Sequence, residues 1–227
     1  MAPGPVVSLI VAQPPITPVT SLASSELVTL TPGVVKSIEA PRLRVSAPLT
    51  ADDKALVDRA SDYLQGLGEV KGRFEQIDAR GGVSHGDLYL KRPGKARFVF
   101  DPPSGLLVVS DGSTVLVSNP RLKTTNRYPL GQTPLSLFLA KQVRLDKGVA
   151  VSSVTHFSDG YALTAHDAHH PTQGQITLVF AGAPIQLKEW RMTDSQGRTT
   201  QFRLTDLQSA PGLDPILFVI TAAIPPR

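Results

Sequence analysis

Apolar and polar residues alternate along much of the chain between residues 70 and 207, as they do in antiparallel strands with one dry face and one wet face. The first such segment alternates Val70 and Phe74 with charged neighbours, and the pattern returns around Leu88 and Phe98. Further strands are predicted near residues 105–110, 114–118, 123–128, 149–156, 160–166, 175–180, 185–192 and 198–207. The chain is therefore predicted to be mainly β, with about eleven strands.

Two segments follow the helical period instead. Thr50 and Asp53 have the spacing of a capping box, and the apolar residues that follow recur on one helix face as far as Leu67. The second segment opens with Thr133, a residue type favoured at N-caps, and is apolar nearly all round over residues 135–139. A helix this short and apolar is not stable alone in water, so it must be buried or must cover an apolar hollow.

The first 48 residues have a different character. Prolines interrupt them too often for regular structure, which predicts a Pro-rich tail or linker without regular order. The apolar stretch from Val6 to Ala12 has no preceding Lys or Arg and is followed by two prolines, so it makes a poor secretory signal. The folded domain is predicted to span residues 49–222.

Composition narrows the classes of function. The net charge is +4, but the basic residues are scattered along the chain, which argues against a nucleic-acid surface. The chain has no cysteine, so neither a thiolate nucleophile nor a disulfide is available. No apolar run reaches the length of about 20 residues that a membrane-spanning helix needs.

Catalytic motifs are missing as well. The chain contains no Gly-x-Ser-x-Gly elbow, no phosphate-binding Gly-Lys-Ser/Thr loop and no dinucleotide fingerprint. The one candidate metal cluster is His166, Asp167, His169 and His170, and we interpret it as a polar turn before Pro171 because nothing nominates a further ligand. We therefore expect neither an enzyme nor a bound cofactor.

A series of short motifs carries a resemblance to a known family. In chain order they are Arg73-Phe74-Glu75-Gln76, Lys91-Arg92-Pro93, Ser110-Asp111-Gly112, Asn119-Pro120, Gln132-Thr133-Pro134-Leu135 and Leu217-Phe218. Each motif is weak alone, but their order and spacing over about residues 50–222 resemble the outer-membrane lipoprotein carrier protein family, LolA.

The resemblance implies both a fold and a function. The fold would be an incomplete antiparallel β-barrel of about eleven strands, with short helices forming a lid over an apolar cavity. The protein would act as a monomer in the periplasm. It would collect acylated lipoproteins from an inner-membrane lipoprotein-releasing ABC transporter, shield their acyl chains and pass them to an outer-membrane lipoprotein acceptor.

The resemblance also assigns roles to residues. Arg92 matches the family arginine that hydrogen-bonds the lid, whereas without the resemblance it would be a solvated side chain at a strand end. Sequence alone does not separate a cavity wall from ordinary core. The expected cavity residues are Phe74, Leu88, Leu90, Phe98, Phe100, Leu107, Val109, Leu116, Leu135, Phe138, Leu139 and Trp190.

The chain departs from the family pattern at two places, and other functions stay open. Ala96 stands where some members carry Phe, and residues 115–118 replace an aromatic-rich segment, so we expect a more aliphatic cavity.

The same fold could serve as an outer-membrane acceptor or a lipoprotein-sensing module, although an acceptor of the usual kind carries a lipidated cysteine. A lipid hydrolase is a further alternative, which rests only on the expected cavity.

Overall fold

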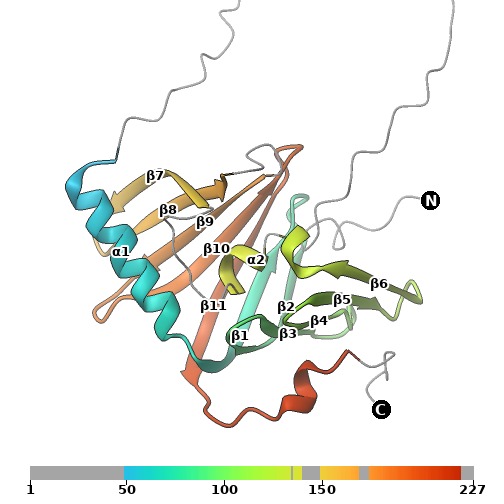
Figure 1. The fold of residues 1–227 in the computed structure, drawn as a ribbon. Helices are drawn as coiled ribbons and strands as arrows, with labels where there is room; N and C mark the ends of the chain where they lie inside the picture. The colour runs from blue at the N-terminus through green and yellow to red at the C-terminus, as the bar shows by residue number, and fades with distance from the viewer. Residues whose placement is uncertain (1–48, 134, 140–148, 169–173, 221–227) are drawn as a thin grey trace, which may run out of the picture.

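The computed structural model describes residues 49–133, 135–139, 149–168 and 174–220. The predicted Pro-rich tail over residues 1–48 lies outside the described residues, as does Pro134, which follows the predicted N-cap residue Thr133. In the described part, one curved sheet carries the two α-helices on its concave side (Figure 1).

Eleven antiparallel strands form this sheet, in agreement with the predicted number. They are β1 (Glu69–Ile77), β2 (Val83–Lys91), β3 (Lys95–Phe100), β4 (Leu107–Asp111), β5 (Thr114–Asn119), β6 (Thr124–Pro129), β7 (Val149–Phe157), β8 (Gly160–Asp167), β9 (Gly174–Ala181), β10 (Gln186–Asp194) and β11 (Thr199–Ser209).

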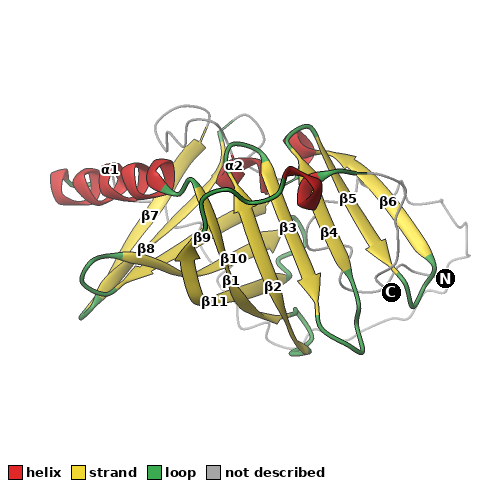
Figure 2. Cartoon of the chain, turned by 90° about the horizontal axis from the view of Figure 1, so that it is seen from below, coloured by secondary structure: helices red, strands yellow, loops and turns green. Residues whose placement is uncertain are grey.

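The order of the strands leaves the sheet open. It runs β6-β5-β4-β3-β2-β1-β11-β10-β9-β8-β7, so β6 and β7 are edge strands and do not pair with each other. Strands β1 and β11, from opposite ends of the folded part, pair at the centre from Val70↔Ser209 to Ile77↔Gln201. The result is half of a barrel rather than a closed one (Figure 2).

Helix α1 (Ala51–Gly66) begins as the sequence predicts. The hydroxyl of Thr50 accepts a hydrogen bond from the backbone N–H of Asp53, and the Asp53 carboxylate accepts one from the backbone N–H of Thr50. This capping box satisfies two of the N–H groups that a helix start leaves without partners. The buried face of α1, which includes Val57, Ala60 and Leu64, lies against the sheet.

The remaining helical segments are short. The 3-10 helix η2 (Leu130–Gln132) and the helix α2 (Leu135–Leu139) follow β6, and the 3-10 helix η4 (Pro215–Phe218) follows β11. The hydroxyl of Thr133, between η2 and α2, donates to the carbonyl of Leu130 at 2.8 Å. None of the described helices is long and apolar enough to cross a membrane.

The two faces of the sheet differ in chemistry. The concave face carries the hydrophobic core, whereas the convex face carries ion pairs such as Arg203 with Glu75 at 3.1 Å and Arg73 with Asp87 at 3.0 Å. Hydrogen bonds from Arg73 also lower the pKa of Asp101. A dry face opposite a charged face is what the alternating sequence predicts.

Candidate functional site

Aromatic rings from both halves of the sheet meet at the centre of the concave face. Phe74 in β1 packs edge-to-face on Phe100 and Phe98, with ring centroids 4.9 and 5.7 Å apart. Trp190 in β10 stacks on Phe202 in β11 at 5.1 Å, and Phe98 meets Trp190 at 6.2 Å. Each such pair contributes about 0.5–1.5 kcal/mol beyond the area that it buries.

A glycine makes room for the central ring. Gly86 in β2 lies opposite Phe74 in the β1–β2 ladder and opposite Phe100 in the β2–β3 ladder. A Cβ at this position would lie 2.7 Å from Phe74 Cζ and 2.3 Å from the carbonyl oxygen of Val99. Only glycine therefore lets the Phe74 ring lie this close to the sheet.

Helix α2, which we call the lid, covers this aromatic cluster. Leu135, Phe138 and Leu139 are at most 3% exposed, and Phe138 stacks on Trp190 with centroids 5.4 Å apart. The backbone N–H of Gly94, in the β2–β3 turn, donates to the carbonyl of Leu139 at 2.9 Å. A pocket of about 540 Å³ opens beside the lid, between that turn and the β4–β5 turn.

Helix α1 covers the other half of the concave face. Leu64 is fully buried, and the Tyr63 ring packs edge-on against Phe180 in β9 at 5.7 Å. Asp53 Oδ1 lies 2.9 Å from His156 Nε2 in β7, and this hydrogen bond lowers the pKa of Asp53. The start of α1 is thus fastened to an edge strand of the sheet.

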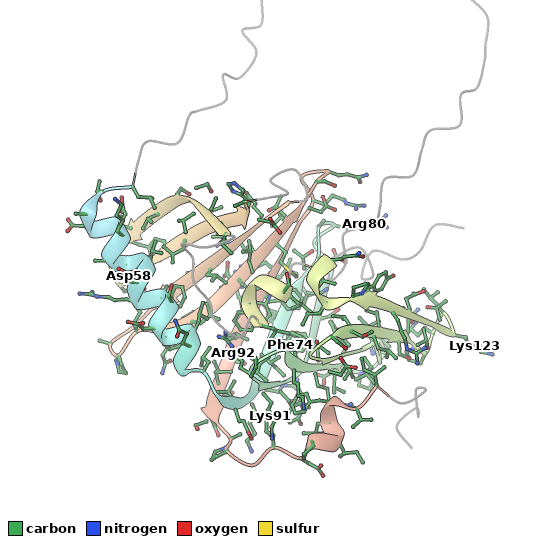
Figure 3. All side chains as sticks on the ribbon, in the orientation of Figure 1. Asp58, Phe74, Arg80, Lys91, Arg92 and Lys123 are labelled. Atoms are coloured by element: carbon green, nitrogen blue, oxygen red, sulfur yellow. The ribbon has the colours of Figure 1, made fainter. Side chains whose placement is uncertain are left out.

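Arg92 fastens the carboxyl end of α1 (Figure 3). Its Nη1 donates to the carbonyl oxygen of Leu64, and its backbone N–H donates to the carbonyl of Gly68 at 3.0 Å. Burial lowers the pKa of the guanidinium to about 10, so it stays charged at neutral pH. A cation is favourable at this end of a helix, where carbonyl groups lack partners.

Most of the predicted cavity residues meet on the concave face. They belong to one buried cluster, which includes the predicted Phe74, Leu88, Leu90, Phe98, Phe100, Leu135, Phe138, Leu139 and Trp190. Their side chains pack together with the buried face of α1 in this cluster.

Three predicted cavity residues lie elsewhere, and the expectation that they line the concave face is wrong. Val109 pairs with both Arg97 and Leu116, so these three side chains share the convex face. Leu107, opposite Val99, lies on the convex side as well. The concave positions of β4 and β5 are instead occupied by Val108, Val115 and Val117.

The C-terminal segment explains why part of the convex face is apolar. It runs outside the sheet, where η4 packs against β3 and β4 (Figure 1). Arg97 Nη1 donates to the carbonyl of Leu217 at 3.1 Å, and Phe218 is buried. Val109 and Leu116 are buried on this convex face and are not available to a ligand on the concave face.

Much of the concave face in the second half of the chain was not predicted from the sequence. Residues of β8 to β11 belong to the same buried cluster as the predicted ones. They include Tyr161, Leu163, Leu178, Phe180, Met192 and Phe202. Their alternation with polar neighbours was the available signal, since each strand places every second residue on the same face.

A few polar atoms on this buried surface have no partner. Gln76 Oε1, Thr200 Oγ1 and the Tyr161 hydroxyl are buried and make no hydrogen bond within the described part of the chain. Burial also raises the pKa of Tyr161. A buried polar group without a hydrogen bond lowers the stability of the fold by about 1–3 kcal/mol. Each of these atoms therefore departs from the rule that buried polar groups are hydrogen-bonded.

The candidate metal cluster is only partly described. His166 and Asp167 are the last residues of β8, whereas His169 and His170 lie outside the described residues. Where the structure describes the chain, no three His, Asp or Glu side chains gather as a metal site would require.

An open antiparallel half-barrel with an apolar concave face under two helices defines the architectural class of this protein. The family model described as "Outer membrane lipoprotein carrier protein LolA" matches residues 65–221. The chain belongs to this family, as the order of its motifs predicted.

Two sequence relatives support the same assignment. The chain is 29% identical over 185 residues to an outer-membrane lipoprotein carrier protein of Dechloromonas aromatica, covering 77% of this chain and 86% of that protein. It is 25% identical over 205 residues to one of Pseudomonas aeruginosa, covering 85% and 96%. A crystal structure of a LolA superfamily protein from Nitrosomonas europaea aligns with a TM-score of 0.44 and 9% identity, over 73% of this chain and 96% of that one.

Proposed function

We propose that this protein is a periplasmic carrier that binds the acyl chains of lipoproteins against the concave face of its half-barrel. It takes them from an inner-membrane lipoprotein-releasing ABC transporter and delivers them to an outer-membrane lipoprotein acceptor. The family assignment and the names of the relatives support this role. Binding and release require no catalysis by the protein.

The observation that carries the proposal is the match between the lid and the surface that it covers. The lid buries Leu135, Phe138 and Leu139 on an aromatic and aliphatic surface. An acyl chain offers the same kind of contact and can replace the lid there. Because each buried CH₂ is worth about 0.8 kcal/mol, one long acyl chain gains on the order of 10 kcal/mol by leaving water.

Arg92 fits a gating role in this scheme. It joins the β2–β3 turn to α1, and two residues further along the same turn Gly94 holds the lid. A movement of this turn therefore acts on both helices. We propose that the Arg92 contact holds this turn against α1, so that Gly94 keeps the lid closed on the empty carrier until an acyl chain displaces the lid.

The first test measures uptake of cargo. The purified protein should bind a lipoprotein or a fluorescent fatty-acyl probe, and should not retain the same lipoprotein without its acyl chains. Phe138→Glu should weaken uptake at least tenfold, because the acyl chain would have to desolvate a carboxylate. Leu122→Glu is a matched control, since Leu122 is 49% exposed at the β5–β6 turn. Equal retention of acylated and unacylated cargo would contradict the proposal.

The second test identifies the natural cargo and the partners. The protein would be recovered from a periplasmic extract, and acylated polypeptides bound to it would be identified by mass spectrometry. Enrichment of acylated over unacylated forms is expected. Transfer is then followed from vesicles that carry the ABC transporter to the carrier, and from the carrier to the acceptor. Failure of both transfers with an intact, loaded carrier would remove the transport role and leave only acyl binding.

A further inference from the structure

Two unpartnered polar atoms lie side by side on the concave face. Gln76 follows Phe74 by two residues in β1, so both side chains lie on the same side of the sheet. Phe202 lies directly opposite Gln76 in β11, and Thr200 precedes Phe202 by two residues. Thr200 is therefore the diagonal neighbour of Gln76, within reach of a single bridging group.

Both residues are well buried. Gln76 is 1% exposed and Thr200 is fully buried, yet neither Gln76 Oε1 nor Thr200 Oγ1 has a hydrogen-bond partner among the residues that the structure describes. Ser110 Oγ, by contrast, is satisfied on the concave side, where it donates to the carbonyl of Gly94 at 2.6 Å, whereas the Tyr161 hydroxyl in β8 is a further unpaired group away from this pair. Native proteins rarely leave such groups unpaired, so each requires an explanation, of which a functional role is one.

Gln76 and Thr200 lie next to the aromatic cluster. Phe74 and Phe202 belong to that cluster, and Gln76 and Thr200 lie two residues further along their strands, about 7 Å away. They mark the end of the half-barrel formed by the β1–β2 and β10–β11 turns, which we call the Gln76 end. Arg92 and the carboxyl end of α1 lie at the opposite end, because β2 runs antiparallel to β1.

We infer that Gln76 and Thr200 bind the carbonyl linkage of an acylated ligand whose chain lies over the aromatic cluster. The Thr200 hydroxyl donates to the carbonyl oxygen. The terminal amide of Gln76 accepts from the N–H of an amide linkage, or turns to donate to an ester. This inference rests on the proposed function and adds an orientation: the chain points toward the Arg92 end, and the polar part leaves at the Gln76 end.

The test compares three uncharged probes that differ only in the linkage. Each has a sixteen-carbon chain attached to the same short ethylene glycol, through an amide, an ester or an ether. We expect the native protein to bind the amide and ester probes about tenfold more tightly than the ether. Thr200→Val, which keeps the shape of the side chain, should bring all three to the ether value, and Gln76→Leu should reduce the preference as well.

Controls separate recognition from folding. Thr200→Val should leave the free energy of unfolding unchanged or higher, because it removes an unsatisfied group. Thr164→Val makes the same change on the convex face, where the hydroxyl contacts Thr177 at 3.0 Å, and should keep the preference for a carbonyl. If the native protein binds the ether probe as tightly as the other two, the inference is wrong while acyl binding stands. If none of the three probes binds, the proposed function itself fails.

Discussion

The two helices that cover the concave face are built in different ways. Helix α1 has 16 residues, a capping box and polar fastenings at both ends, to His156 and to Arg92. The lid has 5 residues and is held by three buried side chains and by the hydrogen bond from Gly94. An isolated helix shorter than about 12 residues is marginal in water, so the lid depends on its packing and α1 depends on it less.

This difference decides which cover a ligand displaces. Lifting the lid gives up one backbone hydrogen bond, from Gly94, and apolar contacts that an acyl chain entering the same surface replaces. Lifting α1 would also break the contact between a partly buried guanidinium and the carbonyl of Leu64, which an acyl chain does not replace. We therefore expect α1 to stay in place while the lid moves.

The largest expected effect comes from removing the core of α1. Leu64 is fully buried against the sheet, so Leu64→Ala should lower the free energy of unfolding by about 2–5 kcal/mol. Urea unfolding followed by circular dichroism measures the loss. Leu122→Ala, at an exposed turn, should stay within about 0.5 kcal/mol of the native protein. A loss below about 1 kcal/mol at Leu64 would mean that α1 is the movable cover.

The lid should respond differently to the same kind of change. Phe138 is 3% exposed, and a core Phe→Ala change usually costs about 3–5 kcal/mol. Because the lid can detach without unfolding the sheet, Phe138→Ala should lower the global free energy of unfolding by less than half of that amount. Its effect should appear as faster hydrogen exchange at the Gly94 N–H, whose acceptor is Leu139 in the lid.

Hydrogen exchange offers an internal control for that experiment. The N–H of Arg92 donates to Gly68, just beyond the end of α1, and lies only two residues from Gly94. Phe138→Ala should therefore accelerate exchange at Gly94 and leave it unchanged at Arg92. If both amides accelerate equally, the two covers open together and α1 is not held more firmly than the lid.

Arg92 tests the fastening of α1 directly. Arg92→Met keeps much of the apolar stem and removes the charged hydrogen bond to Leu64, so about 1.5–3 kcal/mol of stability should be lost. Uptake of an acyl probe should become faster and cargo should be retained less selectively. Arg92→Lys, which keeps the charge, should recover part of the stability. Unchanged uptake and transfer in Arg92→Met would remove this residue from the gating scheme.

The sequence predicted the strands well because their alternation is local. The capping box at Thr50 and the number of strands were predictable for the same reason. The face of β4 and β5 was not, because residues 106–109 and 115–117 are continuous apolar runs. Such runs are buried on both sides and give no period from which to choose a face.

Contacts between segments that lie far apart in the sequence set the remaining limit on what the sequence can predict. The burial of Val109 on the convex face and the pairing of Gln76 with Phe202 both require knowledge of which strands meet. The polar pair at the Gln76 end is invisible in the sequence, since nothing local shows that Thr200 lies beside Gln76 or that neither finds a partner. The apolar concave surface can thus be predicted from the local sequence pattern. Its unpaired polar atoms depend on which strands pair and in which register.

The smallest expected effect concerns the other end of α1 and depends on pH. The hydrogen bond from His156 lowers the pKa of Asp53 in the folded state, and Thr50 adds two more hydrogen bonds. A carboxyl group with a lowered folded pKa stabilises the protein above its unfolded pKa of about 3.9, and this contribution disappears as the pH falls through the folded value. Thermal unfolding of the native protein and of Asp53→Asn should therefore differ near pH 6 and converge at strongly acidic pH.

Because the pair of Asp53 and His156 is exposed, the difference in stability should be smaller than that for Arg92→Met. Hydrogen exchange at the Gly94 N–H, which contacts the lid, should not change. A difference that persists unchanged at the lowest pH would show that the Asp53 charge does not hold the start of α1, and the fastening of this helix would then rest on Arg92 and its buried face.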